Sequence, residues 1–168
     1  MMNQDIRRLL TNLITEQKEN YYRLAYNYVK NEQDALDVVQ DSIHKALRSM
    51  DKIQDPTALK SWFYKIVVHT SLDLLRKRKK VILMEDSQFE TNKYGQLDHY
   101  TDYDLRQAID ELPYKYKTII ILRYFEDFKI DEIADVLDEK VSTIKTRLYK
   151  AHKILRLKID QEESGRKK

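Results

Sequence analysis

The chain has 168 residues, with 31 Lys or Arg against 28 Asp or Glu, so its net charge of +3 points to no particular partner. Only two Gly and two Pro occur, and apolar residues recur every three or four positions, which favours helices over strands and tight turns. The absence of cysteine excludes disulfides, thiolate metal sites and a thiol nucleophile. No apolar run approaches the ~18 residues of a membrane span, and no signal-peptide pattern opens the chain. We therefore expect an all-α, cytoplasmic protein.

Two helices are predicted in the first fifty residues. Apolar and aromatic residues recur at helical spacing from Thr11 to Val29, which predicts a core helix. After a polar break at 31–33, Asp34 is expected to cap a second helix that ends at Leu47. The predicted inner face of the second helix carries Leu36, Val39, Ile43, Ala46 and Leu47.

The second helix also has a polar face with two carboxylates. Asp37, Gln40, Asp41 and His44 share it at spacings i, i+3, i+4 and i+7. A di-metal bundle would need Glu-x-x-His pairs on several helices, and no such pair accompanies this face. Two interpretations remain: a solvated surface, or a docking face for a basic partner.

A long basic helix follows a polar loop at 48–56. Thr57 is expected to cap this helix, which runs from Ala58 to about Lys80. Trp62, on its apolar side, is predicted to lie in the core of the protein. Between Lys60 and Lys80 seven basic residues face the single acid Asp73. Because this run continues an amphipathic helix, it predicts a phosphate-binding stripe.

An acidic segment separates two helical blocks. Periodicity lapses between Leu83 and Asp104, where six acids face only Lys93, which predicts a linker. It either provides solubility or covers a basic segment when DNA is absent. We therefore expect two small helical domains, 1–82 and 104–168, joined by a flexible linker at 83–103.

The second block ends in a predicted helix-turn-helix. Pro113 is expected at the first position of a helix, and two further helices within 128–158 are separated by 138–141. The last helix buries Ile144, Leu148, Ala151 and Leu155. Between Lys140 and Lys158 it carries seven Lys or Arg and no acid, unlike a solvated helix that mixes both signs. This pattern predicts a helix that enters a DNA major groove, and the tail 162–168 is expected to fray.

Strings of residues in both halves resemble one family. In the first half, three strings are similar to regions 2.2 to 2.4 of bacterial extracytoplasmic-function (ECF) sigma factors: Asp34-Ala-Leu-Asp-Val-Val-Gln-Asp41, Trp62-Phe-Tyr-Lys-Ile66 and Asp73-Leu-Leu-Arg76. In the second half, four are similar to regions 4.1 and 4.2: Leu112-Pro113, Ile121-Leu-Arg-Tyr-Phe125, Glu132-Ile-Ala134 and Thr143-Ile-Lys-Thr-Arg147. The resemblance extends over nearly the whole chain, in the family's order. The composition, rich in Tyr, Lys and Ile, is similar to the sigma-V-type group.

The resemblance implies a non-catalytic role. A sigma factor binds core RNA polymerase through the β′ clamp helices and the β flap, and directs promoter-specific initiation, here in a stress or cell-envelope response. Promoter DNA and an anti-sigma factor are the other implied partners, with no cofactor, metal or membrane insertion. One alternative is a helix-turn-helix regulator that acts without being a polymerase subunit. An enzyme is disfavoured because the four histidines show no ligand spacing and no phosphate loop or nucleophile motif appears.

Site residues are carried over position by position. The resemblance places core polymerase binding at Asp34, Asp37, Gln40 and Asp41. It places −10 DNA binding at Arg48, Lys52, Lys60, Lys65, Arg76, Lys77 and Lys80, where the loop at 48–55 captures a flipped base. It places −35 DNA binding at Arg123, Ser142, Thr143, Lys145, Thr146, Arg147, Tyr149 and Lys150.

Four positions depart from the family pattern. Asp138 stands where the turn usually has Gly, and Glu139 replaces an apolar residue, which is expected to loosen the turn. Lys129 replaces a helix cap, so the first helix of the pair is expected to fray. His69 stands where many members have Asn, and no role is carried over to it. These departures bear on the promoter sequence that the protein reads.

Overall fold

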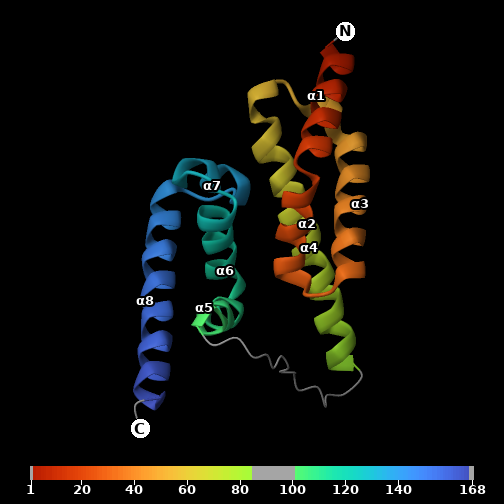
Figure 1. Cartoon of the computed structure of the whole chain (residues 1–168). Helices are drawn as coiled ribbons and strands as arrows, with labels where there is room; N and C mark the ends of the chain where they lie inside the picture. Colours follow the sequence, from red (N-terminus) through yellow and green to blue (C-terminus); the bar gives the residue numbers. More distant parts are fainter. Residues whose placement is uncertain (1, 85–100, 167–168) are drawn as a thin grey trace. The chain divides into compact units, whose positions relative to one another are not determined.

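The secondary structure consists of helices alone in the part that the structure describes. The computed structural model describes residues 2–84 and 101–166 (Figure 1), with the side chains of residues 4–79 and 105–165. The helices are α1 (Met2–Glu16), α2 (Lys18–Val29), α3 (Glu32–Ser49), α4 (Leu59–Met84), α5 (Thr101–Asp110), α6 (Tyr114–Ile120), α7 (Ile130–Leu137) and α8 (Val141–Arg166). No strand occurs within these ranges, and the predicted all-α class is confirmed.

The described helices divide into two compact units, α1–α4 and α5–α8. The two helices that flank the predicted linker extend into it, because α4 continues to Met84 and α5 begins at Thr101. The remainder of that acidic segment, 85–100, lies outside the described residues. Among the helices that the structure describes, none combines the length and the apolar character that a bilayer crossing requires.

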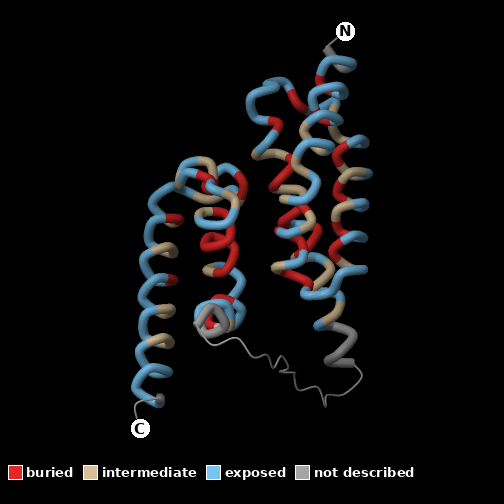
Figure 2. The backbone as a smooth tube through the Cα atoms, in the orientation of Figure 1, coloured by how far each residue is buried: buried red, intermediate tan, exposed pale blue. Residues whose placement is uncertain are grey.

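The first unit is held together by a buried aromatic cluster. Tyr21 of α2 meets Phe63 and Tyr64 of α4 edge-on, at ring-centroid distances of 4.7 and 5.0 Å. All three residues are buried, and the buried stretches of these helices face one another (Figure 2). Aromatic pairs in this geometry contribute beyond the area that they bury.

The single core helix predicted over 11–29 is wrong. The helix is interrupted at Gln17, whose backbone is at φ −117° and ψ 22°, and two helices result. The added helix, α1, buries Ile6 and Leu10 in the same core. α2 ends where Lys30 adopts a left-handed conformation and its N–H bonds the carbonyl of Tyr26.

The predicted cap of α3 is also wrong, and its predicted inner face is right for Ala46 but wrong for Leu36 and Leu47. Asn31 is the cap, and its side chain accepts a 2.9 Å hydrogen bond from the backbone N–H of Asp34. The buried face consists of smaller residues, Ala35, Val38, Ser42 and Ala46, whereas Leu36 is 54% exposed. Small side chains permit the close packing of α3 on α2, so the larger leucines, including Leu47, lie outside.

The segment between α3 and α4 is more ordered than the predicted polar loop. Two short 3₁₀ turns, Met50–Lys52 and Pro56–Ala58, flank a buried Ile53. The cap of the second turn is Asp55, not Thr57: its carboxylate accepts the backbone N–H of Thr57 at 3.0 Å and the hydroxyl at 2.7 Å. These hydrogen bonds lower the pKa of Asp55.

The second unit packs α5, α6 and α8 around one apolar cluster. Its buried members are Ile109, Leu112, Ile120 and Ala151, with Leu148 and Leu155 packed against them. Pro113 is the N-cap of α6 and not its first residue, and a π-helical turn, Ile121–Phe125, continues that helix. The tail from residue 162 was expected to fray, but α8 continues as a helix to Arg166. Residues 167–168 lie outside the described residues.

The predicted helix-turn-helix is confirmed as α7 and α8, with a firmer turn than expected. Asp138 takes the left-handed conformation, at φ 56°, and the N–H of Glu139 bonds the carbonyl of Ala134 at 3.0 Å. The Glu132 carboxylate accepts the N–H of Lys129 at 2.8 Å, so α7 has a cap despite the lysine. Glu139 does not loosen the turn but pairs with Arg147 at 3.2 Å.

Candidate interfaces for nucleic acid and protein

An acidic face on α3 is fully available to a partner. Asp37, Gln40 and Asp41 are all exposed. Asp37 accepts a 3.2 Å hydrogen bond from Gln33, and Asp41 lies 3.6 Å from the Lys45 ammonium. Exposed interactions of this kind contribute little, so neither carboxylate is committed to the fold. Leu36, which was predicted inside, is exposed and places an apolar side chain beside Asp37 in the sequence.

Asp34 differs from the other three predicted docking residues. It is half-buried and forms an ion pair with Arg78 of α4. The pair joins the first turn of α3 to the basic run of α4, a role that the spacing of the sequence does not reveal. In the structure, Asp34 therefore forms a contact within the first unit.

The basic residues of the first unit lie mostly at the surface. Arg48, Lys52, Lys60 and Lys77 are exposed, and Lys65 is half-buried. Arg76 is also exposed but pairs with Asp73 at 2.8 Å. The side chain of Lys80 lies outside the described residues. A backbone phosphate would compete with Asp73 for Arg76.

Trp62 stands at the edge of a hollow and not in the core. The hollow, of about 230 Å³, lies between α3 and α4 and is lined by Lys45, Trp62, Lys65, Ile66, His69 and Thr70. Lys45 donates to the Thr70 hydroxyl at 3.0 Å across it. An aromatic edge next to ammonium groups suits an unstacked base with its phosphate. Sequence reasoning missed Lys45 because its hydrogen bond to Thr70 joins α3 to a different helix, α4.

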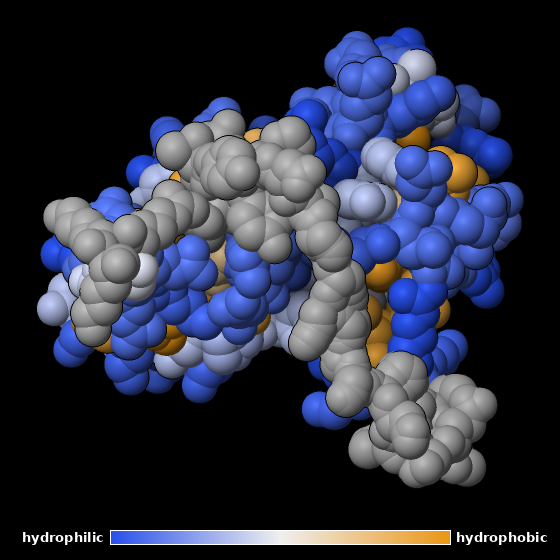
Figure 3. All heavy atoms as spheres, turned by 60° about the horizontal axis from the view of Figure 1, so that its bottom comes forward, coloured by the Kyte–Doolittle hydropathy of each residue, from blue (hydrophilic) through white to orange (hydrophobic). Residues whose placement is uncertain are grey.

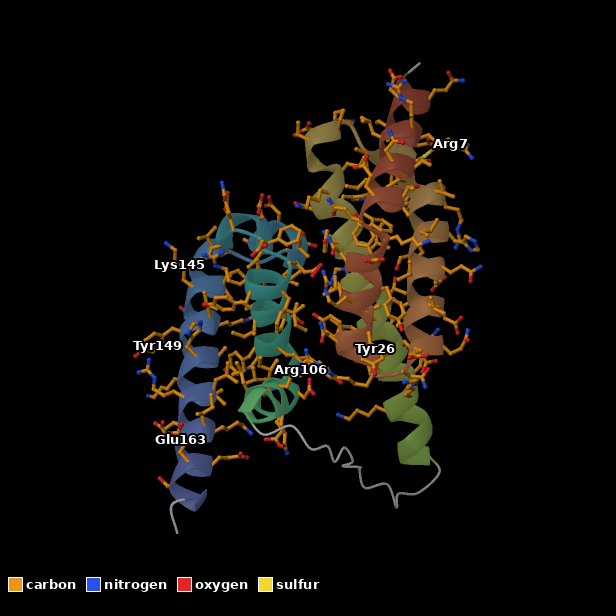
Figure 4. All side chains as sticks on the ribbon, viewed as in Figure 1. Arg7, Tyr26, Arg106, Lys145, Tyr149 and Glu163 are labelled. Carbon is orange, nitrogen blue, oxygen red and sulfur yellow. The ribbon has the colours of Figure 1, made fainter. Side chains whose placement is uncertain are left out.

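The outer face of α8 presents most of the predicted −35 residues to solvent. Ser142, Lys145, Thr146, Tyr149 and Lys150 are exposed, and Tyr149 is 72% exposed. The side chains of Lys145 and Tyr149 point away from α6 (Figure 4). An exposed row of this kind on a helix-turn-helix fits a DNA major groove. Thr143 is half-buried at the start of the helix.

Two predicted DNA-contacting arginines make contacts within the second unit. Arg147 pairs with Glu139 across the turn at 3.2 Å. Arg123 donates to the backbone carbonyl of Phe128 at 3.1 Å. Both are half-buried, so the structure gives each a role in holding the helix-turn-helix together.

The visible surface is predominantly hydrophilic, with only isolated apolar patches (Figure 3). In the described residues, no group of three His, Asp or Glu is arranged to hold a metal ion. The arrangement thus offers binding faces: one acidic face on α3, cations on α4 and cations on α8.

Comparison with known families matches both halves of the chain. Residues 13–81 match the model described as Sigma-70 region 2, and residues 103–155 match Sigma-70, region 4. The chain is 52% identical to RNA polymerase sigma factor SigV of Bacillus subtilis over 160 residues, which cover 95% of this chain and 96% of that protein. It is 27% identical to ECF RNA polymerase sigma factor SigW of the same organism, over 83% of this chain and 82% of that protein.

Solved structures share the fold. One is the sigma factor RpoE in complex with the anti-sigma factor NepR from Bartonella quintana, with a TM-score of 0.70 and 22% identity over 89% of this chain and 96% of that one. Another is CnrH in complex with the cytosolic domain of CnrY, with a TM-score of 0.69 and 21% identity over 92% of this chain and 90% of that one.

Proposed function

Because the chain belongs to the extracytoplasmic-function group of the sigma-70 family, we propose that its three binding faces serve core RNA polymerase, the −10 element and the −35 element. The observation that carries this is the match of region 2 and region 4 in their family order, together with 52% identity to a sigma factor over 95% of the chain. The protein directs promoter-specific transcription initiation. The protein acts by binding its partners, in the cytoplasm and during a stress or cell-envelope response.

Core RNA polymerase binds the acidic face of α3, where Asp37, Gln40 and Asp41 meet basic side chains of the β′ clamp helices. The exposed Leu36 adds an apolar contact at the edge of that face. Asp34 acts indirectly, because its ion pair with Arg78 fixes the start of α3. The second unit contacts the β flap.

The −10 element binds the first unit, with 1–82 as the domain. Cations on α4 and in the preceding segment hold the separated strand: Arg48, Lys52, Lys60, Lys65, Arg76, Lys77 and Lys80. The loop at 48–55 binds the flipped base. Stacking on this base and hydrogen bonds to its edge must offset the few kcal/mol that flipping costs.

The −35 element binds the second unit, 104–168, as duplex. Lys145, Thr146, Tyr149 and Lys150 read it, with Ser142 and Thr143 at the helix start near phosphate. Arg123 and Arg147 support the reading helix from within, and the segment 83–103 tethers the two domains.

An anti-sigma factor is the partner that regulates the protein. Of two solved structures that share its fold, one is a sigma factor in complex with an anti-sigma factor, and the other is CnrH in complex with the cytosolic domain of CnrY. Such a partner would cover the faces that core polymerase and DNA otherwise occupy.

Lys145 and Lys153 separate base reading from phosphate holding. Lys145 lies one turn into α8, where a recognition helix meets base edges, and Lys153 lies two turns later. Lys145→Ala should cost on the order of 1–3 kcal/mol of binding and relax the preference at one or two −35 positions. Lys153→Ala should weaken all sequences equally and reduce the log-affinity against log-salt slope by roughly one.

The measurement is binding of the holoenzyme to a panel of single-base −35 variants at several salt concentrations. Uniform loss in the Lys145 variant, with altered base preference in the Lys153 variant, would show that the register of α8 on DNA is wrong.

Binding to core polymerase tests the proposed function against the alternative of a regulator that acts alone. The full chain is mixed with core enzyme from Bacillus subtilis. We expect the two to co-elute, with one chain bound to each core enzyme. A chain that binds promoter DNA specifically but elutes apart from core would be such a regulator.

A further inference from the structure

Thr146 lies on the exposed face of α8 that is proposed to read the −35 element. It belongs to the second turn of the helix, which begins at Val141, and its side chain is exposed. At 3.6 residues per turn it falls between Tyr149 and Lys150 around the helix axis, and both of these are exposed as well. Tyr149 points away from α6 (Figure 4). Thr146 therefore stands where the N-terminal half of a recognition helix meets base edges.

The hydroxyl of Thr146 is bonded to its own helix. It donates a 3.0 Å hydrogen bond to the backbone carbonyl of Ser142, in the preceding turn. A hydroxyl has a single proton to donate, so this proton is used before any base arrives. The substituents of Cβ occupy staggered positions, and with Oγ1 turned back toward the Ser142 carbonyl, the Cγ2 methyl projects away from it. The group that Thr146 presents to DNA is thus a methyl.

The charged groups beside Thr146 are hydrogen-bond donors. Lys150 lies one turn later on the same face, at i+4, and Lys145 precedes Thr146 in the chain; both are exposed. Oγ1 keeps lone pairs that accept from an amino group, but an ammonium has donors and no acceptor. Adenine N6 or cytosine N4 at this place would bring a further donor against these two ammonium groups. The surroundings of Thr146 therefore favour a base that presents an acceptor.

Thymine is the base that combines an acceptor with a methyl group in the major groove, as O4 and the C5 methyl, whereas guanine presents acceptors without a methyl. We propose that Thr146 reads a thymine of the −35 element through contact of its Cγ2 methyl with the C5 methyl of the base. This inference rests on the proposed −35 function of α8. It specifies which base one position of the helix recognises, and by which atoms.

The expected effect is modest but belongs to one base. Burial of a methyl group from water contributes about as much as burial of a methylene, which corresponds to roughly fourfold in affinity. Deoxyuridine lacks the C5 methyl of thymine and keeps O4 and the hydrogen bonds of the base pair. Replacing one thymine by deoxyuridine therefore removes the proposed contact and leaves the hydrogen-bonding groups of that base pair in place.

The test is binding of the holoenzyme to promoter fragments in which each thymine of the −35 element, on either strand, is replaced in turn by deoxyuridine. We expect the wild type to lose about fourfold in affinity at one of these positions. Thr146→Ser keeps the hydroxyl and removes the methyl, so it should bind the thymine and deoxyuridine fragments equally at that position. Thr146→Val keeps the methyl and removes the hydroxyl, so it should retain the difference.

Thr15→Ser is the matched control. Thr15 is an exposed residue of α1, in the first unit, and its hydroxyl donates the same kind of bond, at 2.8 Å, to the carbonyl of Thr11. Loss of this methyl should leave the thymine–deoxyuridine difference as it is in the wild type. Each difference is measured within one protein, between two DNA fragments, so a change in the stability of a variant affects both measurements alike.

Three results would overturn the inference. One is a wild type that binds every deoxyuridine fragment as tightly as the thymine fragment. Another is a Thr146→Ser variant that keeps the full difference. The third is a difference that is lost in Thr146→Val but kept in Thr146→Ser, which would show that the hydroxyl contacts the base. Failure of the wild-type holoenzyme to distinguish fragments with and without the −35 element would instead refute the proposed function.

Discussion

Reversal of two charges on α3, Asp37→Lys with Asp41→Lys, should weaken binding to core RNA polymerase by at least ~30-fold. Each lysine would face the basic side chains that the carboxylates are proposed to meet. Removing one partner from a desolvated charge pair costs about 2–5 kcal/mol, and opposing like charges costs more. The fold should survive, because the only contacts described for these carboxylates are exposed ones to Gln33 and Lys45.

The matched control is the double variant Glu16→Lys with Glu19→Lys. Both residues are exposed and lie near the α1–α2 break, and the substitutions change the net charge by the same amount. Affinity can be measured by competition of each variant with the wild type for labelled core enzyme. If the α3 variant bound as tightly as the control, the polymerase would be docked elsewhere.

Tyr21→Ala should destabilise the first unit by about 3–5 kcal/mol. The ring is buried between Phe63 and Tyr64, so truncation leaves a cavity and removes two aromatic contacts. Small domains are stable by only about 5–15 kcal/mol, and the loss is a large part of that margin. Tyr21→Phe retains the ring and should cost no more than about 1 kcal/mol.

Urea denaturation followed by tryptophan fluorescence provides the measurement. The chain has one tryptophan, Trp62 of α4, so its emission reports the first unit. The midpoint should fall far below that of the wild type for Tyr21→Ala and only slightly for Tyr21→Phe. Equal midpoints for the alanine and phenylalanine variants would show that the aromatic cluster does not hold this unit together.

Periodicity predicted most of the helices but only part of the buried face of α3, which includes the predicted Ala46 but not Leu36 or Leu47. That helix carries two apolar stripes, and the leucines made the outer one look like the core. Packing against α2 instead selects the stripe of smaller residues that includes Ala35, Val38 and Ser42. This choice depends on the distance between the two helices and not on hydrophobicity alone. The consequence for function is direct, since Leu36 becomes a surface residue next to Asp37.

Breaks and caps were predicted least well because their signals are local and weak. Nothing at Gln17 resembles a Gly or Pro breaker, yet two helices meet there. The caps at Asn31 and Asp55 lie three and two residues before the predicted ones, and in each case several capping residues stand close together in the sequence. Asp138 was the exception, since the resemblance to the family placed it at the turn position usually held by Gly, where Asp tolerates a left-handed backbone.

Contacts between distant residues were the part of the site that the sequence could not supply. The recognition helix was placed correctly from its basic face, whereas the partners of Arg147 and Arg123 required the fold. The same holds for the ion pair of Asp34 with Arg78 and for the hydrogen bond of Lys45 with Thr70. Each of these contacts joins two elements of the fold. The residue pattern of one element carries no information about which residue of the other element it meets.

Transcription from a defined promoter tests the central claim most directly. Core enzyme from Bacillus subtilis should be supplied with the full chain and a library of genomic fragments from a related bacterium, and run-off products should be mapped. We expect discrete start sites that core enzyme alone does not produce, with a shared −35 and −10 pair upstream of them. Transcripts no more specific than those of core enzyme alone, on every fragment, would contradict the assignment of this chain as a promoter-directing subunit.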